Sequence, residues 1–528
     1  MMKKAIKKLL AALLAVAMVC AMAIPAFAYN PGETKEDLNT KHDYGAFQIF
    51  EGVISKDNET LSDVNWGQNI TEPDIFLANL KNDPTIGEKF ETAATAQDVL
   101  AVISKWHDSD DNSIAFARVV CHYLYPDANA NPTPVATDHT GGINIPKSGY
   151  YLIVDTSTFS DDDFYHAYNS FFLLNVPQTP YVVLVNHKVV KPTVEKEVYD
   201  NNDIGSTGGW GSSADHAINE PFQFRLIAKL PASENNGRAY DYYKEYAVCF
   251  TDTLSDGITF DKLDTVEITN GDGSTPQVIN NYTLDPNNPQ SSFKLSIDDV
   301  KTCVPDLNKG ATITVTYTAH LNEKAYVNTV GGGTDNKNSV YLEYSNNPRI
   351  STSLDHTTTS EVCVYTYQLN NTKHQDSENG PVLEGAGFRL YSNEACNAED
   401  EIKLKMNDDG TYSRDFSTEG KGVEMLSNKD GQFNVKGLDA GTYYLKETTP
   451  PTGYSACANK EIVISATHDV NHVDLSGNLS TTIINKKDGG ITLPSTGGIG
   501  TTLFYVVGGG LMVAAIVLLV TKKRMENK

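Results

Sequence analysis

The chain has 528 residues, 40% of them hydrophobic, and a formal net charge of −25. This length predicts several domains, and so acidic a surface disfavours nucleic-acid binding because it repels the phosphate backbone. The sequence contains neither a P-loop nor a dinucleotide-binding fingerprint, and we predict no cofactor and no metal site.

The first 28 residues have the pattern of a secretory signal peptide. An apolar stretch over 9–24 and the small-x-small sequence 26–28 follow a basic start made of Lys3, Lys4, Lys7 and Lys8. We therefore expect an exported chain whose mature N-terminus is Tyr29, and residues 1–28 are left out of the fold prediction.

The first region, residues 29–188, reads as a β domain with a helical insertion. Strand patterns and one helical pattern alternate along it, with strands expected at 44–50, 149–155, 171–174 and 181–185 and helical structure at 95–125. The helical residues fall between the strand patterns, which is why we expect an insertion rather than a separate helical domain.

The middle region, residues 189–359, begins with a linker around Pro192 that leads into a first strand. Asn and Gly clusters, which are typical of turns, separate further strands expected at 222–230, 246–253, 311–321 and 339–344. The third region, residues 360–490, has strand patterns at 362–369, 387–391, 431–435, 441–446, 461–464 and 481–484. Turns at such regular spacing predict immunoglobulin-like sandwiches, and the whole chain is predicted to be mainly β, with three such domains in tandem.

Residues 491–528 carry a pentapeptide, an apolar run and a basic tail in that order. The pentapeptide is Leu493, Pro494, Ser495, Thr496 and Gly497. The apolar run, 499–520, is long enough to cross a bilayer as a helix, and the basic residues 522–524 would hold the chain end on the cytoplasmic side. This order resembles the sorting signal of Gram-positive surface proteins, in which a sortase cleaves between Thr and Gly. We expect transient membrane anchoring, then cleavage after Thr496.

Six cysteines remain once Cys20 leaves with the signal peptide. An even number in an exported protein permits disulfides, and each of two pairs falls within one proposed domain: Cys249 with Cys303, and Cys396 with Cys457. The alternative is that these residues are free buried thiols.

Motifs in all three regions resemble the major pilins of sortase-assembled Gram-positive pili. The matching stretches are 44–50, 61–67 and 145–151 in the first region, 192–198, 251–260 and 342–348 in the middle region, and 383–391 and 443–454 in the third. The last of these resembles the E-box of a Cna-B-type domain. The resemblance implies one lysine that links subunits and further lysines that form isopeptide bonds within domains.

The linking lysine of this family lies in a motif at the end of the first domain. The matching run is 183–188, which places Lys188 at the lysine position, although Asn186 and His187 replace the usual Tyr-Pro. Lys191 is the alternative. The reaction needs an exposed primary amine, which lysine provides and arginine does not.

An intramolecular isopeptide bond needs a lysine, an asparagine and a carboxylic acid that are buried together. Burial disfavours the charged form of lysine, and a carboxyl kept protonated by the same burial donates a hydrogen bond to the asparagine carbonyl. The amine then attacks and ammonia leaves. The resemblance assigns Lys373, Asn485 and the E-box residue Glu447 to the third domain. It assigns Lys196, Asp252 and Asn346 to the middle domain, with Asn347 as the alternative to Asn346.

Together these features predict a shaft subunit of a covalent surface pilus. A pilus-specific class C sortase would join Thr496 to Lys188 of another copy, and a housekeeping sortase would attach the last subunit to peptidoglycan. Minor pilins and a host or microbial surface ligand are further expected partners. The alternative is a monomeric wall-anchored adhesin. An anchored enzyme is disfavoured because the histidines, among them His107, His122, His139 and His166, form no evident catalytic or metal-binding pattern.

Overall fold

A computed structural model describes residues 43–54, 61–107, 110–138, 142–157, 170–176, 181–184, 191–201, 208–231, 239–271, 273–286, 291–304, 307, 310–328, 336–350, 352–417, 421–477 and 479–488. The predicted signal peptide, the pentapeptide and the apolar run 499–520 lie outside these ranges. Within them, no helix is both long and apolar enough to span a membrane.

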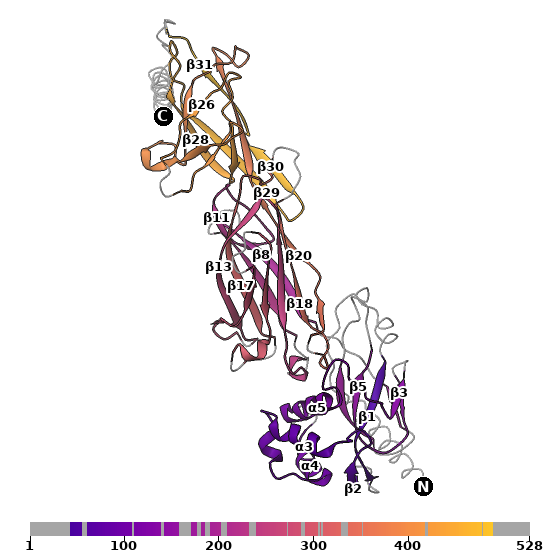
Figure 1. Cartoon of the computed structure of the whole chain (residues 1–528). Coiled ribbons are helices and arrows are strands. Elements are labelled where there is room, and N and C mark those ends of the chain that lie inside the picture. Colours follow the sequence, from indigo (N-terminus) through magenta and orange to yellow (C-terminus); the bar gives the residue numbers. More distant parts are fainter. Residues whose placement is uncertain are drawn as a thin grey trace, which may run out of the picture.

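The described residues form three β-rich bodies that follow one another along an elongated molecule (Figure 1). Strands β1 and β5 lie near one end of the molecule and β31 lies near the other, while β8, β13 and β17 lie between them (Figure 1). Strand predominates over helix throughout, so the prediction of a mainly β chain is confirmed.

The first domain combines a sheet with a group of helices beside it (Figure 1). Its main sheet has the strand order β2-β1-β5-β6, with β3 paired to β1, and β4 and β7 pair separately. These elements are β1 (Tyr44–Ile54), β2 (Leu61–Trp66), α3 (Pro73–Asn82), η1 (Gly87–Phe90), α4 (Ala96–Ile103), α5 (Asp111–Leu124), β3 (Ala136–Asp138), β4 (Gly142–Ile145), β5 (Gly149–Asp155), β6 (Phe171–Val176) and β7 (Tyr181–Leu184). The helical insertion therefore starts earlier than predicted, with α3, and is divided into separate helices.

An aromatic core attaches the helices to this sheet. Phe76 of α3 packs edge-on against Trp66 of β2 at 5.6 Å between ring centroids, and Phe116 of α5 lies 6.3 Å from Phe76. Phe76 and Phe116 are both fully buried. Such aromatic contacts stabilise the core beyond the area that they bury.

The middle domain consists of two sheets that enclose one core. Their strand orders are β10-β20-β18-β12-β16-β15, with β19 paired to β18, and β14-β13-β17-β11-β8-β9. The elements are β8 (Thr193–Asp200), β9 (Gly209–Gly211), β10 (Ser213–Asp215), β11 (Pro221–Lys229), η3 (Ala239–Tyr242), β12 (Val248–Leu254), β13 (Ile258–Thr269), β14 (Gln277–Val278), β15 (Thr283–Asp285), β16 (Phe293–Ile297), η4 (Val300–Thr302), β17 (Thr312–Leu321), β18 (Lys337–Ser345), β19 (Leu354–His356) and β20 (Ser360–Tyr365). Alternate residues of β17 and β18 are buried, as expected for strands with one face on a core.

The third domain is also built from two sheets. Their strand orders are β24-β25-β27-β21-β31 and β23-β22-β28-β29-β30, with β26 paired to β22. The elements are β21 (Tyr367–Gln375), β22 (Gly387–Tyr391), η5 (Ala398–Asp400), β23 (Glu401–Ile402), β24 (Leu404–Met406), β25 (Tyr412–Arg414), β26 (Met425–Leu426), β27 (Val435–Leu438), β28 (Gly441–Thr449), β29 (Lys460–His468), β30 (Val473–Gly477) and β31 (Ser480–Asn485). The first strand, β21, pairs in parallel with the last, β31.

The boundary between the middle and third domains differs from the predicted one at 359/360. The single strand predicted at 362–369 is two strands, β20 and β21, with Thr366 between them. β20 pairs with β18 in a sheet of the middle domain. Neighbouring residues of β20 pack in different hydrophobic cores. Val364 packs in the core of the middle domain, and Tyr365 packs in the core of the third. A single uninterrupted strand pattern hides such a change of partner. The middle domain therefore extends through β20.

Polar and close backbone contacts join the domains. Arg118 of α5 donates a 3.0 Å hydrogen bond to the backbone oxygen of Asp241 in η3, and an ion pair with Asp83 of its own domain, at 3.1 Å, orients the Arg118 side chain. At the other junction, the backbone nitrogen of Ile218 donates a 3.0 Å hydrogen bond to the oxygen of Gly437. These contacts connect each domain to the next one along the molecule.

Candidate functional site

In the third domain the structure brings Lys373, Asn485 and Glu447 together. Lys373 Nζ lies 2.5 Å from Asn485 Oδ1 and 3.4 Å from Glu447 Oε1, and Asn485 Nδ2 donates a 2.7 Å hydrogen bond to the same Glu447 oxygen. Each of the three side chains lies on the buried face of its strand, the same face that carries core residues such as Leu369 on β21 and Leu445 on β28. Strand alternation therefore carries all three polar side chains into the core.

This cluster is closed to water. The side chains of Lys373 and Glu447 are 0% exposed, and the ring of Phe388 lies 5.2 Å from Lys373 Nζ. Burial lowers the pKa of Lys373, against the opposing effects of Cys457 and Glu447. A lysine with a lowered pKa is more often neutral and so more nucleophilic.

The acid contacts a different part of the amide from the one that we expected. Glu447 faces the amide nitrogen of Asn485, whereas the carbonyl oxygen of Asn485 faces Lys373. One carboxylate oxygen thus contacts both the lysine nitrogen and the amide nitrogen, which is the geometry of a proton relay between two nitrogen atoms.

All six described cysteines are free thiols, so the structure does not support the two disulfides considered from the sequence. The side chains have other partners. Cys249 accepts a 3.2 Å hydrogen bond from Ser296, and Cys303 Sγ lies 3.7 Å from the backbone oxygen of Asp299. Asn459 donates to Cys396, and the backbone nitrogen of Cys457 donates a 2.7 Å hydrogen bond to Glu447.

In the middle domain Lys196 and Asp252 form a fully buried ion pair, with both side chains 0% exposed. Tyr317 completes the contact, because Lys196 Nζ lies 3.1 Å from its hydroxyl and that hydroxyl donates to Asp252 Oδ1 at 3.2 Å. The rings of Phe224 and Tyr317 lie 5.2 and 5.4 Å from Lys196 Nζ. Lys196 lies on β8 of one sheet, and Asp252 lies on β12 of the other.

Burial shifts the pKa values of this pair toward the neutral forms. It lowers the pKa of Lys196 to about 8, and the attraction of Asp252 opposes that shift. It also raises the pKa of Asp252, against the opposing effect of Lys196. The pKa of Tyr317 rises well above its ordinary value for the same reason. The tyrosine therefore keeps its proton and acts as a hydrogen-bond donor.

The asparagine that the structure places beside this pair is Asn338, and not the predicted Asn346. Asn338 is 0% exposed and donates a 2.6 Å hydrogen bond to the hydroxyl of Tyr317. Asn346 follows the far end of β18 and accepts a hydrogen bond from Ser353, and Asn347 accepts one from the backbone of Arg349. A strand rises about 3.3 Å per residue, so the turn that contains Asn346 is far from Asn338. Strand alternation in the sequence could have identified Asn338, because it lies on the same buried face of β18 as Val340 and Leu342.

The two candidate linking lysines are Lys188 and Lys191. Lys188 lies outside the described residues, as do all members of the pentapeptide 493–497. Lys191 is described, and its side chain is 15% exposed and 3.7 Å from Asp355 Oδ2. A lysine held in this way is less accessible to a second protein than an extended surface lysine.

These features define the chain as a protein of tandem β-sandwich domains, two of which hold a lysine, a carboxylic acid and an asparagine buried together. Residues 369–478 match the SpaA family, described as a prealbumin-like fold domain, and residues 485–527 match the LPXTG cell wall anchor motif. The matches confirm the predicted anchor and cell-wall localisation, and they support the resemblance to sortase-assembled pilins. No curated protein matches the chain.

Several solved structures of pilus backbone proteins are similar to this chain. The pilus 2b backbone protein of group B streptococcus is 24% identical, with 52% of this chain and 95% of that one covered and a TM-score of 0.37. The T6 backbone pilin of Streptococcus pyogenes serotype M6 is 16% identical, with 85% and 97% covered and a TM-score of 0.45. The full-length major pilin SpaD of Corynebacterium diphtheriae is 17% identical, with 88% and 96% covered and a TM-score of 0.39.

Proposed function

We propose that the chain is the shaft subunit of a covalent cell-surface pilus. A class C sortase cleaves after Thr496 and transfers the threonine carbonyl to Lys188 of the next subunit, and repetition gives an open head-to-tail fibre. The observation that carries the proposal is the third-domain cluster, in which Lys373 on the first strand meets Asn485 on the last strand beside Glu447.

In that cluster an isopeptide bond forms in one step that needs no cofactor. The neutral Nζ of Lys373 attacks Cγ of Asn485, the bond from Cγ to Nδ2 breaks, and ammonia leaves. Glu447 carries the proton from Nζ to the departing nitrogen, because one of its oxygens lies 3.4 Å from the first and 2.7 Å from the second. The side-chain bond then crosslinks the two strands that carry the pulling force into and out of the domain.

The middle domain supports the same chemistry with Lys196, Asp252 and Asn338. Asp252 accepts the proton of the lysine, with which it forms a buried ion pair. The hydroxyl of Tyr317 orients the amide nitrogen of Asn338 at 2.6 Å. The carbonyl oxygen of Asn338 is buried and has no hydrogen-bond partner among the described residues, so it carries no contact that would hold it away from the attacking amine.

Lys188 is favoured over Lys191 as the inter-subunit amine. Before the Lys191 amine could enter a sortase, its ion pair with Asp355 would have to break. The Lys191 side chain, which is largely buried, would also have to become exposed. In the proposed assembly minor pilins join the fibre, and a housekeeping sortase transfers the last subunit to peptidoglycan. The fibre serves adhesion to a host or microbial surface.

Co-expression of the chain with its own pilus sortase tests the proposal. We expect a ladder of high-mass species on a denaturing gel that disappears in Lys188→Ala and persists in Lys191→Ala. The absence of a ladder from the wild-type chain would support the alternative, a monomeric wall-anchored adhesin. A ladder lost only in Lys191→Ala would instead reverse the assignment of the linking lysine.

A further inference from the structure

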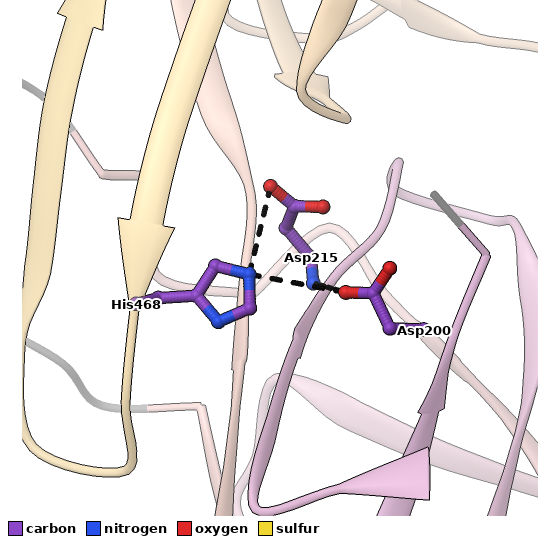
Figure 2. Close-up of side chains that lie close together, drawn as sticks. All are labelled: Asp200, Asp215 and His468. Atoms are coloured by element: carbon purple, nitrogen blue, oxygen red, sulfur yellow. Dashed lines mark hydrogen bonds and ion pairs between the residues drawn. The ribbon is translucent and has the colours of Figure 1, made fainter. Parts of the chain in front are cut away.

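The two domain junctions of the molecule are built differently. Between the middle and third domains, His468 Nε2 lies 3.8 Å from Asp200 Oδ2 and 4.0 Å from Asp215 Oδ2, and these side chains are buried (Figure 2). Between the first and middle domains lies an open cleft of about 900 Å³. Its walls come from α3 and α5 on one side and from η3, Lys244 and Lys301 on the other. Clefts of about 300 to 1,000 Å³ at domain boundaries are common sites for small ligands.

Two partly buried cations that line this cleft are held in fixed positions. Arg118 donates to the backbone oxygen of Asp241 at 3.0 Å and pairs with Asp83 at 3.1 Å. Lys301 Nζ donates to two backbone oxygens, of which that of Lys244 lies at 2.7 Å. A guanidinium has five N–H donors and an ammonium has three, so each side chain keeps donors that these contacts do not use. A ligand would therefore meet hydrogen-bond donors whose positions are set before it binds.

His122 of α5 adds an acceptor to the cleft that it lines. Its Nδ1 lies 2.9 Å from the backbone oxygen of Arg118. Because a carbonyl oxygen only accepts, Nδ1 carries the proton, and Nε2 of the neutral ring carries a lone pair. Nε2 has no hydrogen-bond partner among the described residues. Burial lowers the pKa of His122, against the opposing hydrogen bond to Arg118, which keeps the ring neutral and the lone pair open to a ligand.

The exposed rim of the cleft carries further polar side chains. Asn79 and Asn82 of α3 and Lys244 of the middle domain are exposed and line the cleft. Their side chains form no hydrogen bond or ion pair within the part of the chain that the structure describes. An amide side chain both donates and accepts hydrogen bonds. The apolar side chains of Ile114 and Val119 also line the cleft, so that polar groups surround an apolar surface.

The formal charges of the lining cancel. The cations are Arg118, Lys244 and Lys301, and the carboxylates are Asp83, Asp111 and Asp241. A strongly charged ligand, such as a phosphate or a polyamine, gains no net attraction from such a lining. A neutral ligand rich in hydroxyl groups suits it better, because each hydroxyl donates one hydrogen bond and accepts two.

We propose that the cleft between the first and middle domains binds a neutral disaccharide unit of a surface glycan. Arg118 and Lys301 donate to sugar oxygens, and His122 Nε2 accepts from a sugar hydroxyl. The C–H faces of the sugar rings pack on Ile114 and Val119. Each subunit thus carries its own glycan site, a role beyond that of a shaft. The site depends neither on polymerisation nor on the isopeptide bonds.

Calorimetric titration of the full chain with neutral disaccharides tests the proposal. The probes are lactose, maltose, cellobiose and N,N′-diacetylchitobiose, and we expect at least one of them to bind saturably at one site per chain. The double variant Asn82→Ala with Lys244→Ala should raise its Kd about tenfold, because two hydrogen bonds are lost. Both residues are exposed, so this variant keeps the fold. Lys81→Ala is the matched control, since Lys81 is exposed beside Asn82 but lies outside the lining.

Thermal unfolding provides a second measurement of the same site. The sugar that binds should raise the Tm of the wild type and of Lys81→Ala, and at the same concentration it should raise that of the double variant less. Failure of every disaccharide to bind, or an equal Kd in the wild type and the double variant, would overturn the proposal. Binding of inorganic phosphate or spermidine in place of the sugars would also overturn it and would mean that the cleft selects charge. None of these measurements involves a sortase, so their failure would leave the shaft role standing.

Discussion

Lys196 and Asn338 meet at the hydroxyl of Tyr317 from two facing sheets, with Lys196 Nζ at 3.1 Å and Asn338 Nδ2 at 2.6 Å from the same oxygen. The phenol thus holds the amine and the amide next to each other inside the middle domain. Because Asp252 also contacts the lysine and the phenol, the four side chains form one connected buried network.

This network predicts which asparagine is crosslinked. The intact mass of the wild-type chain should be lower than its sequence mass by one ammonia for each of two bonds. The Asn338→Ala variant should be lighter than its own sequence mass by only one ammonia, because the middle-domain bond cannot form. Asn346→Ala, the matched control in the turn after β18, should still be lighter by two. The measurement is intact-protein mass spectrometry. A mass change in Asn346→Ala alone would return the assignment to the turn.

Glu447→Gln should prevent the bond in the third domain while the middle-domain bond still forms. Glutamine keeps the size of the side chain but cannot relay a proton. Lys373 and Asn485 are 112 residues apart in the chain, and closing a loop of this length by a disulfide stabilises a protein by about 5 kcal/mol. We expect a loss of similar size in the free energy of unfolding, measured by denaturant titration alongside the intact mass. Glu461→Gln, on the exposed side of β29, is the control and should change neither quantity.

The stability of a chain that lacks the middle-domain bond should depend on pH. In Asn338→Ala the amine of Lys196 stays titratable, and the pKa in the folded wild-type structure is about 8 against the ordinary 10.5. Between these two values the unfolded state binds more protons than the folded state, so stability rises with pH. The rise should total about 3 kcal/mol and should be absent below pH 8.

Denaturant titrations over this pH range measure the effect. The double variant Lys196→Met with Asn338→Ala should lack it, because no amine remains at position 196. The wild type should also lack it if the amine has become an amide. A rise of equal size in the double variant would assign the effect to another group.

Gly437→Ala should weaken the junction between the middle and third domains. Gly437 has φ +71°, and a methyl group there would lie 2.4 Å from Ile218 Cγ1. Gly410→Ala is the matched control, since Gly410 has φ +80° and no atom within 4 Å of such a methyl group. Both variants should lose about 1 kcal/mol from the left-handed backbone, and Gly437→Ala should lose about 1 to 3 kcal/mol more from overpacking. Equal losses, measured by denaturant unfolding, would show that the close contact at Ile218 has no energetic role.

Local patterns in the residue order were sufficient for several features of the chain. Apolar alternation and turn residues determined the mainly β architecture, and strands such as β5 and β22 have the predicted bounds. The anchor was recognisable because a motif, an apolar run and a basic tail are contiguous. Lys373, Asn485 and Glu447 were identified because each lies in a motif that resembles a known family.

The tertiary structure decided what depends on contacts between distant strands. The sequence placed the middle-domain asparagine in the turn after β18, whereas the facing of two sheets brings Asn338 to Lys196. A run of alternating residues did not show that β20 and β21 belong to different domains. Sequence spacing also left open a pairing of Cys396 with Cys457, while the structure places Cys457 against Glu447. Alternation defines which face of a strand is buried, but only the packing of sheets against each other defines which buried side chains meet.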